Sequence, residues 1–184
     1  MPEIKIHTSK SEIWNDFAKE IEGNENNENE MGFNEPGELS KDLAKLCRRE
    51  GTIDLDAQRI MYLSQESNIF IELLEGGSRI GFLLLDLPAW GEEAKIEVVC
   101  VSLSQKGKSY SKVLIDEAKR LAKEAGKKRL LLEALGRIIG EKVYKKQGFE
   151  FVDKTGENMV HQLGGKRSTK TKTKTRKLKR RNKA

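Results

Sequence analysis

The run from Gly81 to Leu163 constrains the fold more than any other part of this 184-residue chain. Its hydrophobic periodicity predicts strand, strand, basic turn, helix, strand, helix and strand, in that order. Its middle, residues 96–111, has the sequence IEVVCVSLSQKGKSYS. A turn of this kind leads an apolar strand into a helix whose unpaired N–H groups and positive dipole end face outward, so it is suited to hold phosphate. The sequence therefore predicts a nucleotide or a phosphorylated cofactor as ligand.

The whole pattern predicts a mixed sheet covered by helices. Early hairpin-like strands and a late β-α-β crossover favour a mixed, mostly antiparallel α/β (α+β) arrangement. The turn of the first hairpin is expected at Gly76 and Gly77. The predicted strands are residues 4–6, 68–74, 79–86, 95–102, 129–134 and 149–152, with a further strand over 159–163; the predicted helices are 10–21, 39–50, 116–126 and 138–147.

Length and charge divide the chain into one domain, residues 1–165, and a tail, residues 166–184. The formal net charge is +6, but the tail holds 11 Lys and Arg and no acid, which leaves 24 bases against 29 acids in the domain. Leu178 is the only large apolar residue of the tail, so we expect the tail to be disordered. The polar, turn-rich segment at about 22–38 predicts a mobile acidic loop.

The basic tail predicts nonspecific contact with nucleic acid or with an acidic partner, since it carries no aromatic residue for base stacking. A solvated charge run is the alternative. No apolar stretch approaches the roughly 20 residues of a membrane span, and the first residues lack a secretory signal. We therefore expect an intracellular, cytoplasmic protein without a membrane span, or a nuclear one if the host is eukaryotic. The sequence does not indicate an oligomeric state.

The cysteines and histidines predict no metal site. Cys47 and Cys100 have no CxxC spacing, so the simplest interpretation is two buried small hydrophobic residues. His7 and His161 are too sparse for a site that needs about four converging ligands.

Gly107, Lys108 and Ser109 match the end of a phosphate-binding Walker A loop. That motif requires a glycine five positions before Gly107, where this chain has Ser102. The predicted hairpins also differ from the parallel sheet of a nucleoside-triphosphatase, so this interpretation is disfavoured.

Residues 79–152 resemble the GNAT superfamily of acetyl-CoA-dependent N-acetyltransferases. The family motif [Arg/Gln]-x-x-Gly-x-[Gly/Ala], after a strand rich in Val, corresponds to Lys106–Ser111, and the family's Tyr followed by Gly-Phe corresponds to Tyr144–Phe149. The chain departs from the family at Lys106, at Ser109 and Ser111, where small motif residues are usual, at Arg137, where Asn is frequent, and at Gly140, where Ala is frequent.

The resemblance implies acetyl-CoA as co-substrate. The backbone of Val99, Cys100 and Val101 would pair with the pantetheine arm. The pyrophosphate would contact the loop, and Arg137 stands at a further family position. The loop residues are Lys106, Gly107, Lys108, Ser109, Tyr110 and Ser111.

The resemblance also implies an N-acetyltransferase that moves an acetyl group to a primary amine by direct attack in a ternary complex. Tyr144 resembles the family's general acid; the alternative is a helix tyrosine packed under the sheet. Glu97, expected on the strand face of Val99 and Val101, is the candidate base; the alternative is a solvated carboxylate. Cys100 is expected on the opposite face, which disfavours a covalent acetyl-cysteine route.

The acceptor is constrained only by charge. Six glutamates near the first two helices predict an acidic lip that favours a cationic amine, such as a polyamine or a protein lysine. They are Glu20, Glu22, Glu25, Glu28, Glu30 and Glu38. Acetylation of lysines in the chain's own tail is a second hypothesis. The rival function is a non-catalytic GNAT-like domain whose tail binds nucleic acid or an acidic partner.

Overall fold

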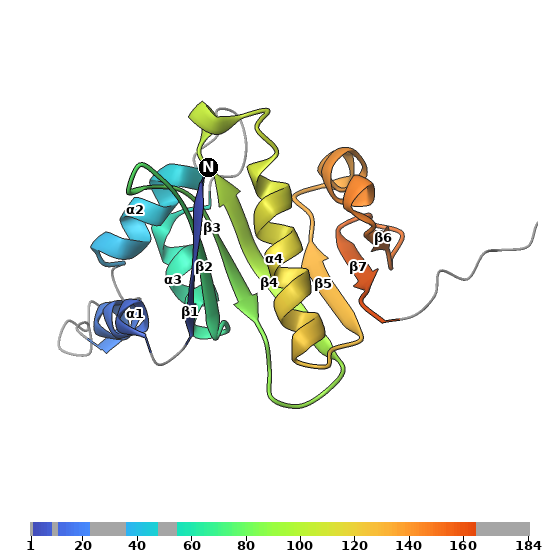
Figure 1. Ribbon diagram of the computed structural model, residues 1–184, viewed down its shortest axis with the longest axis horizontal. Coiled ribbons are helices and arrows are strands. Elements are labelled where there is room, and N and C mark those ends of the chain that lie inside the picture. Colours follow the sequence, from blue (N-terminus) through green and yellow to red (C-terminus); the bar gives the residue numbers. More distant parts are fainter. Residues whose placement is uncertain (1, 9–10, 23–35, 48–54, 165–184) are drawn as a thin grey trace, which may run out of the picture.

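The computed structural model describes residues 2–8, 11–22, 36–47 and 55–164, which form a seven-stranded sheet with helices on both faces (Figure 1). The strand order is β1-β2-β3-β4-β5-β7-β6, and only β4 and β5 pair in parallel. The predicted mixed, mostly antiparallel sheet is therefore confirmed. The strands are β1 (Glu3–Thr8), β2 (Ile69–Glu75), β3 (Ser78–Asp86), β4 (Glu93–Val101), β5 (Arg129–Glu133), β6 (Glu150–Phe151) and β7 (Asn158–Gln162).

The helices are α1 (Glu12–Glu22), α2 (Glu38–Cys47), α3 (Ala57–Gln65), α4 (Tyr110–Glu124) and α5 (Arg137–Ile139). Short 3-10 turns lie at Leu103–Gln105 and Lys145–Gln147. The predicted strands and α1, α2 and α4 are confirmed; α4 begins at Tyr110, directly after the predicted basic turn, and includes most of the predicted 116–126. α3 was not predicted. The predicted helix over 138–147 is instead α5, a π-helical turn at Gly140–Tyr144 and a 3-10 turn.

Two apolar cores cover the two faces of the sheet. Along β3, Leu83 and Leu85 pack into the core under α4, while Phe82 and Leu84 pack into the core under α1, α2 and α3. Successive side chains of a strand point to opposite faces of the sheet, so consecutive apolar residues of β3 reach both cores. The packing on both faces of the sheet therefore holds β4, and with it the start of the loop that follows β4.

Gly140 fits a close approach between the π-helical turn and the sheet edge. A Cβ on Gly140 would lie 2.6 Å from the Phe151 ring and 3.1 Å from Met159 Sδ. An alanine, frequent at this position in the family that the sequence resembles, would therefore force the ring aside.

Glu20 does not belong to an acidic lip. Its carboxylate caps α2: Oε1 accepts the N–H of Leu39 at 2.7 Å and of Ser40 at 3.2 Å, and Oε2 accepts the Ser40 hydroxyl at 2.5 Å. Glu38 is exposed, 3.5 Å from Lys41 Nζ. The side chains of Glu22, Glu25, Glu28 and Glu30 lie outside the described residues, as do residues 23–35 of the predicted mobile loop and the tail, residues 166–184.

Cys47 and Cys100 form a disulfide that joins α2 to β4, and the Cα atoms are 5.3 Å apart. Both residues are buried, as predicted. The interpretation as two unlinked hydrophobic side chains is wrong, because the packing of α2 on β4 brings together residues separated by 53 positions in the sequence. Sequence spacing alone carries no information about such a long-range pair.

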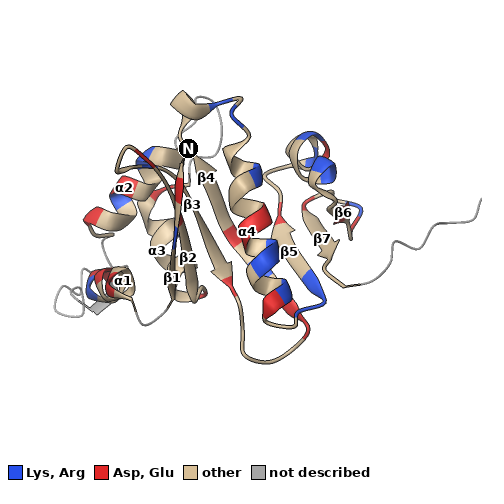
Figure 2. Cartoon of the chain, in the orientation of Figure 1, with Lys and Arg blue, Asp and Glu red and all other residues tan. Residues whose placement is uncertain are grey.

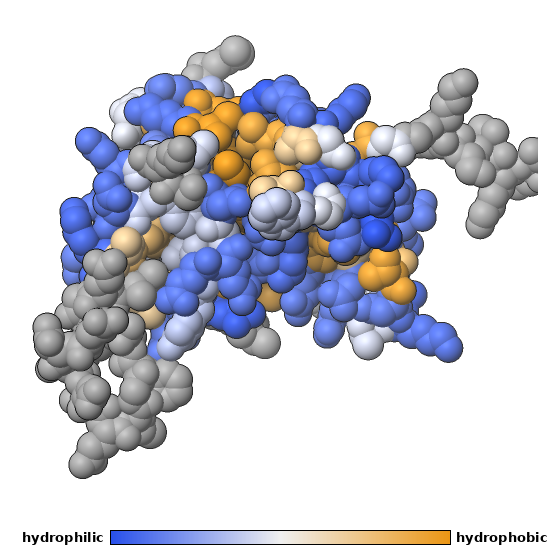
Figure 3. Space-filling view, turned by 90° about the horizontal axis from the view of Figure 1, so that it is seen from below, coloured by the Kyte–Doolittle hydropathy of each residue, from blue (hydrophilic) through white to orange (hydrophobic). Residues whose placement is uncertain are grey.

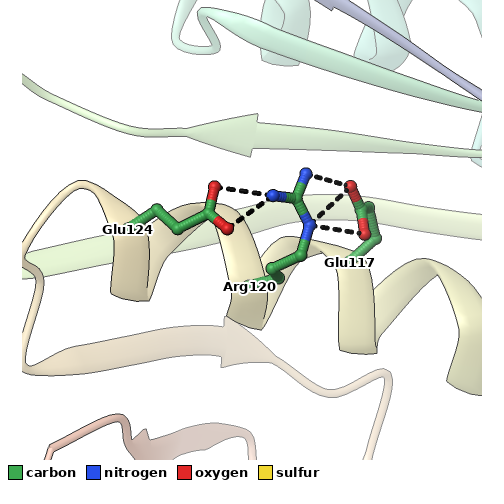
Figure 4. Close-up of polar contacts among 3 residues, drawn as sticks. All are labelled: Glu117, Arg120 and Glu124. Carbon is green, nitrogen blue, oxygen red and sulfur yellow. Dashed lines mark hydrogen bonds and ion pairs between the residues drawn. The ribbon is translucent and has the colours of Figure 1, made fainter.

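The outer face of α4 carries an ion-pair network. Arg120 donates to Glu117, three residues before it, and to Glu124, four residues after it, at 2.6 Å each (Figure 4). Arg120 and Glu124 are largely exposed, so water and salt screen the network and its contribution to stability is small. The molecular face opposite the loop before α4 is mostly hydrophilic, with one large apolar patch and smaller ones (Figure 3). No helix among the described residues is long and apolar enough to cross a membrane.

Candidate active site

β4 and β5 separate toward their carboxyl ends. Their parallel pairing runs from Glu93 with Arg129 to Ile96 with Leu132 and then stops, whereas β4 continues to Val101. Beyond Ile96, the edge of β4 that faces β5 has no strand partner among the described residues. Its backbone groups there are available to an extended ligand.

Two cavities lie along this opening, and three residues, Val99, Leu135 and Tyr144, line both. The loop cavity, of about 440 Å³, extends toward the start of α4. The α3 cavity, of about 370 Å³, extends toward α3. The two cavities are therefore adjacent at these three residues.

Seven of the ten predicted cofactor residues line the loop cavity. They are Val99, Val101, Lys106, Gly107, Ser109, Tyr110 and Ser111, joined by Ser102, Leu103, Gln105, Leu135, Ile139, Val143 and Tyr144. Of the second group, Leu103 and Gln105 come from the 3-10 turn after β4, which was not predicted. Strand and loop thus meet around one hollow, as the motif indicates.

The side chains of the other three predicted cofactor residues do not line this cavity. Cys100 faces the opposite core. Lys108 Nζ lies 3.7 Å from Glu75 Oε2. Arg137 Nε donates to Glu141 Oε1 at 3.2 Å, and its guanidinium lies over the Phe151 ring. The direction in which each of these side chains points depends on the local backbone, which a linear motif does not specify.

The loop before α4 presents backbone donors to the loop cavity. The N–H groups of Lys106 and Lys108 close turns onto Leu103 and Gln105. Those of Gly107, Ser109, Tyr110 and Ser111 have no acceptor among the described residues. They lie at the positive end of a 15-residue helix, and Figure 2 shows Lys along the segment that leads into it. Such an arrangement is chemically suited to hold an anionic group such as phosphate.

Ser109 is the only non-glycine residue with positive φ in the described part of the chain, at +60°. As N-cap of α4 it makes no side-chain hydrogen bond that offsets this left-handed conformation. We expect Ser109→Gly to raise the free energy of unfolding by up to about 1 kcal/mol, because glycine adopts this φ without strain.

The matched control is Ser111→Gly, which places glycine inside the first turn of α4 and should lower the free energy of unfolding by about 0.5 kcal/mol or less. Urea denaturation of both variants tests the pair. If both variants changed the free energy of unfolding in the same direction, the result would contradict backbone strain at Ser109.

The α3 cavity is built largely from residues that the sequence pattern did not reveal. α3 begins at the N-cap Asp56, whose Oδ1 accepts the N–H of Arg59 at 2.7 Å. The sequence carries two signals for α3: an aspartate at the N-cap position, three residues before Arg59, and the apolar residues Ile60, Met61 and Leu63. The lining residues are Leu55, Asp56, Arg59, Leu63, Lys95, Ile96, Glu97, Val98, Val99, Leu132, Glu133, Leu135 and Tyr144.

Tyr144 lies at the junction of the two cavities. It ends the π-helical turn, and its ring packs edge-on against Phe149 with the centroids 6.2 Å apart. The side chain is half-buried and lines both cavities. The contact with Phe149 thus holds the Tyr144 ring beside both cavities.

Glu97 is the extra residue of a β-bulge in β4. Leu84 pairs with Val98 but Leu85 pairs with Ile96, so Glu97 has no partner on β3. Such bulges redirect side chains beside active sites.

The bulge turns Glu97 to the face of α3. Lys95 Nζ lies 2.7 Å from Glu97 Oε2, and Ile96 between them packs under α4. Val99 also packs under α4, so the predicted common face of Glu97 with Val99 and Val101 is wrong. The Glu97 side chain is only 5% exposed, and burial raises the pKa of its carboxyl group although Lys95 opposes the shift.

Comparison with known families and structures agrees with this geometry. The model of the acetyltransferase (GNAT) family matches residues 38–149. A GNAT family acetyltransferase from Elizabethkingia anophelis, solved with acetyl-CoA bound, is 15% identical, with 88% of this chain and 97% of that chain covered and a TM-score of 0.57. The PaiA N-acetyltransferase from Thermoplasma acidophilum, in complex with coenzyme A, is 17% identical, with 87% and 99% covered and a TM-score of 0.56.

Ard1 from Thermoplasma volcanium is 20% identical, with 68% of this chain and 92% of that chain covered and a TM-score of 0.53. At these identities the likeness shows a shared fold. None of the curated proteins matches the chain significantly.

Proposed function

Because this chain belongs to the acetyltransferase (GNAT) family, we propose that it transfers the acetyl group of acetyl-CoA to a primary amine by direct attack in a ternary complex. The observation that carries the proposal is the meeting of two cavities at Tyr144, one beside a phosphate-binding loop and one lined by carboxylates. Two substrates bound in them would face each other, and this positioning supplies several kcal/mol of the barrier.

The loop cavity would hold acetyl-CoA. The free N–H groups of Gly107, Ser109, Tyr110 and Ser111 would donate to the pyrophosphate. The unpaired edge of β4 from Glu97 to Val101 would pair with the amides of the pantetheine arm, as an added strand would. The solved relatives with acetyl-CoA and with coenzyme A bound support this assignment.

The transfer would proceed in the order that the chemistry requires. The acceptor ammonium first loses a proton to the Glu97 carboxylate, directly or through a water. The amine nitrogen then attacks the thioester carbonyl carbon and forms a C–N bond, which gives a tetrahedral intermediate whose collapse breaks the C–S bond. The Tyr144 hydroxyl donates its proton to the leaving thiolate, and the second amine proton leaves with the collapse of the intermediate and restores the phenol. The products are an N-acetylated amine and coenzyme A.

The raised pKa of Glu97 predicts an acid limb in the rate profile. Glu97 acts as a base only when ionised, so kcat/KM falls as the pH drops through its raised pKa. We expect Glu97→Gln to lower kcat/KM about 10²-fold at neutral pH and to remove this limb, so that the remaining pH dependence follows the acceptor amine alone. Profiles of kcat/KM against pH for wild type and variant measure both effects.

Glu93→Gln is the matched control, because Glu93 is an exposed carboxylate of the same strand outside both cavities. An acid limb that persists unchanged in Glu97→Gln would remove Glu97 from the mechanism.

The experiment that tests the function is release of free thiol from acetyl-CoA in the presence of a panel of primary amines, with mass spectrometry of the products. The proposal predicts amine-dependent thiol release and an acetylated amine. The rival, a non-catalytic domain that acts through residues 166–184, predicts none. Mass spectrometry of the protein after incubation with acetyl-CoA also tests self-acetylation of the tail lysines.

A further inference from the structure

Charged side chains line both sides of the α3 cavity. The α3 side presents Asp56 and Arg59, while the sheet side presents Lys95, Glu97 and Glu133, so the sheet side has the excess of acid. Glu97 and Glu133 are the first residues of β4 and β5 after the parallel ladder ends, so they lie where the strands begin to separate. Each lies two positions before a residue that lines both cavities, Val99 and Leu135. The anionic wall is therefore the one next to the transfer point.

The cation on the α3 wall is available to a ligand. The Arg59 guanidinium makes no ion pair and no side-chain hydrogen bond among the described residues. Asp56, the nearest acid in sequence, uses Oδ1 to cap the backbone of α3. Lys95, the other cation of the cavity, is already paired with Glu97 at 2.7 Å. Among the described residues that line the cavity, Arg59 is thus the cation without an ion-pair partner.

Apolar side chains line the cavity as well. Leu55, Leu63 and Leu135 are among them, and the volume of about 370 Å³ lies within the range of small-ligand sites. Such a cavity suits a short carbon chain between two polar ends.

We propose that the acceptor is a small amino acid: a primary amine that points to the acidic wall beside Tyr144, joined by a short carbon chain to a carboxylate that Arg59 binds. The guanidinium fork matches a carboxylate in a two-bond pairing. This inference rests on the proposed acetyl transfer, and it departs from the polyamine expected from charge, since a polyamine would place a second cation against Arg59.

The test compares three acceptors that carry the same amine on the same four-methylene chain and differ only in the far group: δ-aminovalerate (carboxylate), cadaverine (protonated aminomethyl) and pentylamine (methyl). We expect wild-type kcat/KM for δ-aminovalerate to exceed that for each of the other two at least about tenfold. Arg59→Gln should reduce the ratio of δ-aminovalerate to pentylamine about tenfold or more, and Arg59→Glu should make cadaverine the preferred acceptor. Lys41→Gln, which removes an exposed cation from α2 outside the cavity, should preserve the wild-type ratio.

Acetylation of cadaverine or pentylamine with equal or greater kcat/KM overturns the inference and leaves the acetyltransferase function standing. An unchanged ratio in Arg59→Gln also overturns it. Release of no thiol with any of the three overturns it as well, and titration with acetyl-CoA then decides whether the proposed function fails with it.

Discussion

Tyr144→Phe is expected to lower kcat by about 10²-fold to 10⁴-fold, because the variant lacks the proton that the coenzyme A thiolate needs as it leaves. The phenyl ring keeps the edge-on contact with Phe149 and the walls of both cavities. The affinity for acetyl-CoA should therefore stay close to that of wild type. Thiol release at saturating substrates measures kcat, and calorimetric titration measures the affinity.

The matched control is Tyr62→Phe, which removes a phenol from α3 outside both cavities and should leave kcat unchanged. If Tyr144→Phe keeps wild-type kcat while chemistry limits turnover, Tyr144 is a packing residue and another group protonates the thiolate. A parallel loss of acetyl-CoA affinity would indicate a binding role instead.

Loss of the Cys47–Cys100 disulfide is expected to lower the free energy of unfolding by about 4 kcal/mol, since the bond closes a loop of 53 residues and restricts the unfolded chain. Both residues are buried where α2 meets β4, so the double variant Cys47→Ala, Cys100→Ala also removes apolar contacts. Urea denaturation of wild type with and without a reducing agent isolates the contribution of the bond itself.

The double alanine variant is the control for the reducing agent, which should not change its stability. A wild-type protein whose denaturation midpoint is unaffected by reduction, with both thiols shown to be free, would contradict the expected contribution. Cys100 lies between Val99 and Val101, two residues that line the loop cavity. The acetyl-CoA affinity of the same samples therefore shows whether the disulfide also supports this cavity.

The elements that the sequence predicts are those with a strong local signal. The strands β2 to β5 have continuous or alternating apolar runs, and α4 has a long amphipathic pattern that ends at Gly126. α3 has only nine residues and mixes Gln, Arg and Ser with its buried Ile60, Met61 and Leu63. Its stability comes from packing on the sheet, so its own pattern is weak.

The functional site likewise has one part with a local sequence signal and other parts that depend on long-range packing. The loop from Lys106 to Ser111 is local, and the sequence predicts its position at the start of α4. The face of Glu97 depends on a bulge against β3, and one extra residue reverses an argument from alternation. The α3 cavity forms because α3 packs across from β4, and the disulfide forms because α2 packs on β4. Neither a sequence motif nor a hydrophobic period indicates which distant elements pack together.

The account depends most directly on the loop cavity as a coenzyme site, and calorimetric titration with acetyl-CoA, with ATP in parallel, tests it. We predict micromolar binding of acetyl-CoA and none of ATP. Ser111→Glu should weaken binding at least about tenfold relative to Ser111→Gln, because its carboxylate suits the helix start but repels the pyrophosphate. Absence of acetyl-CoA binding in the folded wild-type protein, or equal affinity in the two variants, would contradict the assignment.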